Sequence, residues 1–233
     1  LRFAKIWGNS NQKKFEIISM QRSFHGRTLG SLSIGSNKFY KTGIGQVPKN
    51  VKFCKFNDSQ HLKTLINPKK TLAIIIECIQ GDGGIYVCTK EFANSIKKIC
   101  KKYKILLIVD EIQTGLGRTG MFFSYEHYGF KPDIITVAKA LGTGYPIAAT
   151  IINTKISHSI KLGKYGSTFG GGMMQTRLAY HIIKFINKKN FIKEISKKGF
   201  YLHKQLISLK RQFPSIIKEI RGIGLILAIE FKS

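Results

Sequence analysis

An unbroken apolar run that stops at an acidic residue is the feature that most constrains how this chain of 233 residues folds. Five consecutive large aliphatic residues, Ile105 to Val109, are followed at once by Asp110. Such a run is typical of a parallel strand buried on both faces, and open α/β sheets present functional side chains where these strands end. We therefore expect Asp110 at the C-terminal edge of a buried sheet.

A second apolar run reaches the same edge at a basic residue. The segment 133–144, DIITVAKALGTG, follows a crossover of the length of a helix and carries Lys139 just ahead of a glycine-rich turn. Consecutive parallel strands place their carboxyl ends side by side. The acid of Asp110 and the amine of Lys139 are therefore expected to face one crevice.

Other segments predict an α/β domain in which strands alternate with helices. The run 71–77 indicates another buried strand, which brings Glu77 to the sheet edge, and Thr89 is placed to cap a helix with apolar residues at helical spacing. The remaining predicted elements are a helix end at 1–8, strands at 15–20, 51–56 and 147–153, a short helix at 58–66, helices at 174–188 and 191–213, and a strand pair within 216–231. On the helix 191–213 we expect the apolar stripe that includes Leu202 and Leu209 to be core.

The formal net charge of +27 raises the question of a nucleic-acid partner. Only seven basic residues are arginine, and the lysines are scattered over the predicted helix faces. Base readout and bidentate phosphate contacts favour arginine, and the sequence contains no recognised nucleic-acid-binding module. We interpret the charge as the composition of an AT-biased genome and expect no nucleic-acid partner. A non-catalytic, basic nucleic-acid-binding protein is the alternative from another class.

The four cysteines, Cys54, Cys78, Cys88 and Cys100, have neither C-x-x-C spacing nor a nearby histidine pattern. This indicates reduced thiols in a cytoplasmic protein and no metal site. No apolar stretch approaches the length of a membrane span, so no membrane partner is expected.

Two glycine-rich segments differ in what they indicate. Gly115, Gly117 and Gly120 spell G-x-G-x-x-G, the pattern of a dinucleotide-binding site. Such a site needs the glycines directly after the strand, and here residues 111–114 intervene, so we do not expect a dinucleotide site. The loop 163–172, GKYGSTFGGG, contains Thr168, whose hydroxyl suits a phosphate oxygen.

A lysine, a buried aspartate, a stacking aromatic residue and phosphate donors in one crevice suit pyridoxal phosphate. The turn 22–30 adds the aromatic ring of Phe24 and the guanidinium of Arg27, which fit a flat ring and a carboxylate. A lysine binds the aldehyde of this cofactor and later moves a proton, while an aspartate keeps the pyridine nitrogen protonated. The spacing alone is shared by many α/β proteins.

The sequence resembles the class III pyridoxal-phosphate-dependent aminotransferases, and within them the acetylornithine and ornithine aminotransferases. The matching segments are FHGRTLG (24–30), IIIECIQGDGG (74–84), DEIQTGLGRTG (110–120), KPDIITVAKALGTGYPIAA (131–149), GSTFGG (166–171) and IRGIGL (220–225). The resemblance implies a fold-type-I large domain, with a mostly parallel sheet flanked by helices. Residues 1–213 would form this cofactor-binding domain, including the long connecting helix, and 214–233 would begin a smaller α+β domain.

The resemblance also implies roles for residues that meet the cofactor. Lys139 resembles the lysine that forms the Schiff base, and Asp110 resembles the partner of the pyridinium nitrogen. Gln113 would hydrogen-bond the 3′-oxygen of the ring. Phe24 would stack on one ring face and Ile112 would cover the other.

Three further residues acquire roles in the same way. Arg27 resembles the arginine that holds the substrate α-carboxylate, and its planar fork suits that task. Glu77 resembles an acid that pairs with a later arginine in ornithine-type members. Thr168 resembles the threonine that reaches the cofactor phosphate of the partner subunit, which implies a homodimer with shared active sites.

The sequence departs from the family pattern at a few loop positions. Cys78 replaces the usual proline, Asp82 replaces glutamate, and Gly172 and Met173 replace Asn-Pro. We expect these changes to be tolerated at some cost in stability or rate. The phosphate cup expected before Leu1 and the domain expected after 233 are not part of the sequence, so we expect a fragment of a longer protein.

The activity implied is the transfer of the amino group of N-acetylornithine to 2-oxoglutarate, in arginine biosynthesis. Ornithine, 4-aminobutyrate and succinyl-diaminopimelate are the alternative amino donors within the same family.

Overall fold

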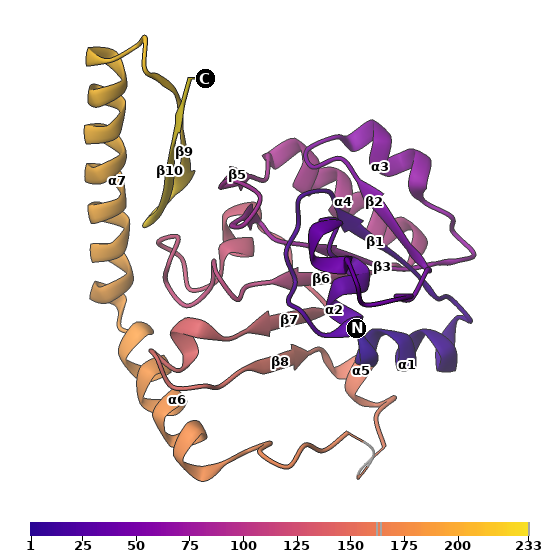
Figure 1. Ribbon diagram of the computed structural model, residues 1–233. Coiled ribbons are helices and arrows are strands. Elements are labelled where there is room, and N and C mark those ends of the chain that lie inside the picture. The colour runs from indigo at the N-terminus through magenta and orange to yellow at the C-terminus, as the bar shows by residue number, and fades with distance from the viewer. Residues whose placement is uncertain (162, 164, 233) are drawn as a thin grey trace.

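A six-stranded sheet organises the computed structural model, which describes residues 1–161, 163 and 165–232 (Figure 1). The strand order is β2-β1-β3-β6-β7-β8. The strands are β1 (Glu16–Met20), β2 (Val51–Cys54), β3 (Thr71–Ile76), β6 (Leu106–Asp110), β7 (Ile134–Val137) and β8 (Ala149–Ile152). All neighbours pair in parallel except β8, which is antiparallel to β7. The expected mostly parallel sheet is confirmed.

The central strands β3 and β6 are buried because helices cover both faces of the sheet there. The helices are α1 (Arg2–Asn11), α2 (Leu29–Ile34), α3 (Ser59–Leu65), α4 (Lys90–Tyr103) and α5 (Thr154–Ser157). Alternate side chains of β3 and β6 point to opposite faces, so Ile74 and Val109 pack with α3 and α4, while Ile75 and Ile108 pack with α1 and α5. This double burial explains why the strands read as continuous apolar runs.

Helix α4 follows directly from its sequence. The Thr89 hydroxyl accepts a hydrogen bond from the Phe92 backbone N–H at 3.1 Å, which caps the first turn as expected. Phe92, Ile96 and Ile99 are buried at helical spacing. The helix ends at Lys104 in the left-handed conformation, with φ 52°. The chain then enters β6, which ends at Asp110.

The last two helices lie beyond β8 and differ in burial. In α6 (Met173–Ile186) the side chains of Ala179, Ile182 and Ile186 pack against the β7 end of the sheet. Helix α7 (Lys189–Gln212) runs along one side of the molecule beside the C-terminal hairpin (Figure 1). The expectation that its apolar stripe is core is wrong, because Leu202 and Leu209 are 41% and 37% exposed. The helix is covered on one side only.

The C-terminal hairpin forms its own two-stranded antiparallel sheet. Strands β9 (Ile217–Ile223) and β10 (Ile226–Phe231) are joined by a tight turn, in which Gly224 has φ 62°. A second small hairpin, β4 (Ile79–Gln80) with β5 (Tyr86–Val87), follows β3 and lies beside β9 (Figure 1). Within the described residues, no helix is both long enough and apolar enough to cross a membrane.

Candidate active site

Asp110 and Lys139 lie at the same edge of the sheet, as the sequence predicts. Asp110 ends β6 and pairs in register with Thr136 of the parallel strand β7. Lys139 follows three residues later, at the start of the 3-10 turn Lys139–Leu141. The two residues therefore stand at the carboxyl ends of neighbouring strands, where open α/β sheets place their ligands.

The backbone of Lys139 is held in an uncommon conformation. Its φ is 43°, in the left-handed region that residues other than glycine rarely adopt, and its side chain is exposed. The turn keeps it there, because the Lys139 carbonyl accepts hydrogen bonds from Gly142 N at 3.0 Å and Thr143 N at 3.1 Å. A Cβ at Gly142 would overlap the Tyr145 carbonyl. Strain of this kind is concentrated at functional sites.

Asp110 is buried and its carboxylate is anchored at both oxygens. Nδ1 of His25 lies 2.7 Å from Oδ2, and the Ile112 backbone N–H donates to Oδ1 at 3.1 Å. His25 is itself buried, and its Nε2 has no hydrogen-bond partner among the described residues. A carboxylate oxygen accepts more than one hydrogen bond, so Asp110 retains capacity for a cationic ligand. From the turn 22–30 the sequence analysis singles out Phe24 and Arg27 for a ligand, and the structure places His25 of the same turn against Asp110.

Glu77 forms a second buried carboxyl beside Asp110. It follows β3, whose last residue Ile76 pairs with Val109, so it lies next to Asp110 at the sheet edge. Its Oε2 accepts a hydrogen bond from the Phe24 backbone N–H at 3.0 Å. Burial raises the pKa of Glu77 to about 7, although His25 and the Phe24 N–H lower it. Glu77 therefore changes its protonation state near neutral pH.

Phe24 and Arg27 meet on a tyrosine that the sequence interpretation did not single out. The Tyr40 ring contacts Phe24 edge-on, with the ring centroids 5.7 Å apart, and the Arg27 guanidinium lies 4.9 Å from the same ring. Arg27 is exposed. Stacking on Tyr40 leaves the edge of the guanidinium, where its N–H donors lie, available to a carboxylate.

Gln113 lies against the β4–β5 hairpin. Gly81 faces its side chain so closely that a Cβ there would overlap the Gln113 amide. Ile112 donates its backbone N–H to Asp110, and the side chains of Ile112 and Gln113 are partly exposed. These two residues therefore lie next to Asp110 at the end of β6, and their contact with a cofactor stays a prediction.

The turn that carries these residues is held by a buried carboxyl, Glu111. Its oxygens accept hydrogen bonds from the hydroxyls of Thr114 at 2.6 Å and Ser124 at 2.8 Å, and from the Tyr125 N–H at 3.0 Å. Burial raises the pKa of Glu111, and these hydrogen bonds oppose that change. A satisfied network of this kind fixes the backbone next to Asp110.

Thr168 is the one sequence-predicted site residue that the structure does not bring near the others. It is exposed in the loop before α6, and no side-chain hydrogen bond is described for it. A role toward a partner subunit would not require contacts within its own chain. The predicted roles of all eight site residues stay predictions.

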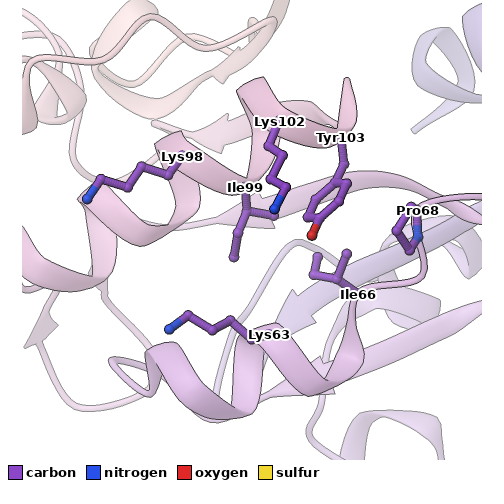
Figure 2. A pocket seen from close by; sticks show the side chains of 7 residues that line it. All are labelled: Lys63, Ile66, Pro68, Lys98, Ile99, Lys102 and Tyr103. Atoms are coloured by element: carbon purple, nitrogen blue, oxygen red, sulfur yellow. The ribbon is translucent and has the colours of Figure 1, made fainter.

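The hollow of about 360 Å³ between α3 and α4 is separate from this site (Figure 2). It is lined by Lys63, Ile66, Pro68, Lys98, Ile99, Lys102 and Tyr103. Both helices end near the hollow and lead into the N-terminal ends of β3 and β6. It therefore lies toward the edge of the sheet opposite Asp110.

Solved transaminases share this fold. The ornithine aminotransferase of Toxoplasma gondii superposes with a TM-score of 0.92 at 28% identity, over 99% of this chain and 56% of that one. An amine transaminase from an uncultivated Pseudomonas species, solved in its PLP-bound form, gives a TM-score of 0.90 at 25% identity, over 100% of this chain and 59% of that one. The expected α/β architecture, fold type I of the pyridoxal-phosphate-dependent transferases, is confirmed.

The sequence comparison defines the family. The family described as "Aminotransferase class-III" matches residues 1–233. The chain belongs to the class-III aminotransferases.

Curated relatives within this family carry related names. Acetylornithine aminotransferase, mitochondrial, of Candida glabrata is 42% identical over 238 residues, 100% of this chain and 56% of that protein. Acetylornithine/succinyldiaminopimelate aminotransferase of Buchnera aphidicola is 40% identical over 95% of this chain and 54% of that protein. Ornithine aminotransferase 1 of Staphylococcus saprophyticus is 39% identical over 99% and 59%. The chain spans about half the length of the curated relatives it matches.

Proposed function

We propose that the protein to which this chain belongs is a pyridoxal-phosphate-dependent aminotransferase that moves the amino group of N-acetylornithine to 2-oxoglutarate, as a step of arginine biosynthesis. The observation that carries this proposal is that Asp110, anchored by His25, and the strained Lys139 stand at the carboxyl ends of neighbouring parallel strands. The names of relatives about 40% identical support the choice of donor.

The residues at the sheet edge fit the cofactor. Asp110 would hold its pyridine nitrogen, because the carboxylate is buried, fixed by two contacts, and still able to accept a charged N–H. Phe24 and Ile112 would cover the two ring faces, and Gln113 would donate to the ring oxygen. When bound, pyridoxal phosphate supplies an aldehyde for the amine and an electron-withdrawing ring.

Lys139 would hold the cofactor aldehyde and then carry a proton. An amine that is released at the reacting carbon is placed to take a proton from that substrate carbon and deliver it to the cofactor carbon that carried the aldehyde. The left-handed backbone keeps the residue at the strand end, opposite Asp110. The Lys139 amine would thus move the proton, while the Asp110 carboxylate would stabilise the positive charge on the ring nitrogen.

Arg27 would bind the α-carboxylate of the substrate. Its guanidinium is exposed and is oriented by the Tyr40 ring at 4.9 Å. Glu77, buried beside Asp110, would help to shape the substrate pocket near the reacting carbon. We further propose that a later arginine pairs with Glu77, as the resemblance to ornithine-type members implies.

We also propose a homodimer in which Thr168 binds the cofactor phosphate of the partner subunit. The segment around Thr168 exposes large apolar side chains that a second copy would cover. Phe169, Met173 and Met174 are 84%, 89% and 72% exposed. Clusters of this kind on one segment are typical of interfaces between proteins. We also propose that the boundary between the large domain and the smaller C-terminal domain lies at 213/214. We propose a cytoplasmic location for the protein.

A specific observation supports ornithine or succinyl-diaminopimelate as a second donor. Relatives of nearly equal identity carry those names, at 39% and 40%. The Arg27 site suits the α-carboxylate that all these donors share, so it does not separate them.

The test is an absorbance spectrum of the full-length protein with added pyridoxal phosphate, followed by N-acetylornithine. We expect a visible cofactor band that bleaches with this donor and returns with 2-oxoglutarate. If only ornithine or succinyl-diaminopimelate bleaches the band, that compound replaces N-acetylornithine as the proposed amino donor. The absence of any cofactor band would overturn the proposal.

A further inference from the structure

An arginine of the C-terminal hairpin contacts the β4–β5 hairpin. Arg221 of β9 donates through Nε to the Gly84 carbonyl at 2.7 Å, and its guanidinium lies 4.2 Å from the centre of the Tyr86 ring. The arginine side chain is 12% exposed. Its Nη1 donates to Glu219 at 2.8 Å and also to Glu230, so both strands of the hairpin hold it in place.

The partner of this arginine is the 81–85 loop, the turn that joins β4 to β5. Figure 1 shows β5 beside the hairpin, and β5 and β9 are in contact. Tyr86, which ends the loop, is contacted by a second cation, because the Arg22 guanidinium lies 5.4 Å from its ring centre. Two guanidinium groups on one aromatic ring hold Tyr86, and with it the adjoining 81–85 loop, in one position.

The 81–85 loop also contacts Gln113, which is expected to meet the cofactor, and the start of the turn 22–30. Gly81 packs against the Gln113 side chain, and a Cβ at this position would overlap the amide and force it to move. At Gly83 a Cβ would lie 2.6 Å from the Arg22 carbonyl, and Gln80 donates to the Gln21 carbonyl at 2.7 Å. The loop therefore links the two residues through contacts, because Arg221 contacts Gly84 and Gln113 contacts Gly81.

We propose that Arg221 is a positioning residue for Gln113. Its contacts with Tyr86 and Gly84 fix the position of the 81–85 loop, and Gly81 of this loop contacts the Gln113 side chain. The position of the C-terminal hairpin therefore sets the orientation of Gln113. The inference rests on the proposed function for the meaning of Gln113, which would meet the ring oxygen of the cofactor. The contacts themselves do not depend on it.

The experiment compares three variants of the full-length protein. Tyr86→Leu removes the ring on which both arginines rest, Arg221→Met removes the guanidinium and keeps most of the stem, and Tyr86→Phe keeps the ring as the matched control. Tyr86 is partly exposed and lies outside the two main cores, so these changes leave the sheet intact. Unfolding curves establish that each variant is folded.

Amide hydrogen exchange without cofactor is the first measurement, because it does not depend on activity. We expect Tyr86→Leu and Arg221→Met to raise exchange in residues 81–86 and also in 112–114 by about tenfold, with Tyr86→Phe close to the unmodified protein. Exchange in 71–76, inside the sheet, should stay unchanged. Unchanged exchange in 112–114 would overturn the proposal.

The second measurement is the pH titration of the cofactor absorbance. A displaced Gln113 alters the hydrogen bond to the ring oxygen, so the titration midpoint should move in Tyr86→Leu and Arg221→Met and not in Tyr86→Phe. A midpoint that is the same in all four proteins would contradict the positioning role. If the unmodified protein binds no cofactor, the proposed function fails, while the exchange experiment still decides whether Arg221 positions Gln113.

Discussion

Nδ1 of His25 lies 2.7 Å from Oδ2 of Asp110, and their side chains are only 2% and 7% exposed. The two residues are 85 positions apart in the chain. The turn after β1 folds back over the sheet edge and brings the imidazole against the carboxylate. Asp110 is therefore held in one orientation before any ligand binds.

This contact predicts a stability difference between two substitutions of His25. His25→Ala leaves the Asp110 carboxylate buried with one partner fewer, so the free energy of unfolding should fall by roughly 1–3 kcal/mol. His25→Asn places an amide N–H close to the position of Nδ1 and should recover about half of that loss. Urea unfolding measures both, and equal loss in the two variants would show that the hydrogen bond is not the cause.

Glu77 predicts a pH-dependent contribution to stability. Its pKa is raised by burial from 4.5 to about 7, so folding favours the protonated carboxyl. That stabilisation is complete below pH 4.5 and is lost as the pH rises through about 7. The corresponding free energy is about 3 kcal/mol.

The Glu77→Gln variant isolates this effect, because the amide oxygen still accepts the Phe24 N–H. Relative to Glu77→Gln, the unmodified protein should lose about 3 kcal/mol of unfolding free energy between about pH 4 and about pH 8. Glu91→Gln, at an exposed position on α4, is the control. A constant difference between Glu77→Gln and the unmodified protein across this range would contradict the assignment.

The Glu111 network predicts a large loss of stability in the turn beside the site. Glu111→Leu leaves two hydroxyls and one backbone N–H buried without their acceptor, so unfolding free energy should fall by roughly 3 kcal/mol. Ser124→Ala removes one of these bonds and should cost about 1 kcal/mol. Chemical unfolding measures both. A loss below about 0.5 kcal/mol in Glu111→Leu would mean that the network does not hold the turn.

Much of the fold and the sheet edge could be predicted because the apolar runs are long and end abruptly. The strand ending at Asp110 and the position of Lys139 follow from the pattern of buried parallel strands. Most element boundaries moved by one to three residues, as with the helix predicted at 174–188 and found at Met173–Ile186. Short elements were missed: α2 has six residues and β4 two, too few for a periodic pattern to emerge.

Contacts between distant segments could not be predicted from the pattern. The pairing of His25 with Asp110 and the stacking of Arg27 on Tyr40 depend on how the turns close over the sheet. The glycine at position 81 gave a partial signal, because a glycine beside a site residue indicates close approach. The partial exposure of Leu202 could not be inferred either, since a helical stripe indicates an apolar face and does not say what covers it.

The central claim is that Lys139 carries the chemistry opposite Asp110. The most direct test is the turnover of N-acetylornithine with 2-oxoglutarate by full-length Lys139→Ala, beside Lys63→Ala, a change at the hollow toward the far edge of the sheet (Figure 2). We expect Lys139→Ala to lose turnover by at least about a thousandfold together with the visible cofactor band, and Lys63→Ala to retain both. Turnover retained in Lys139→Ala would contradict the account.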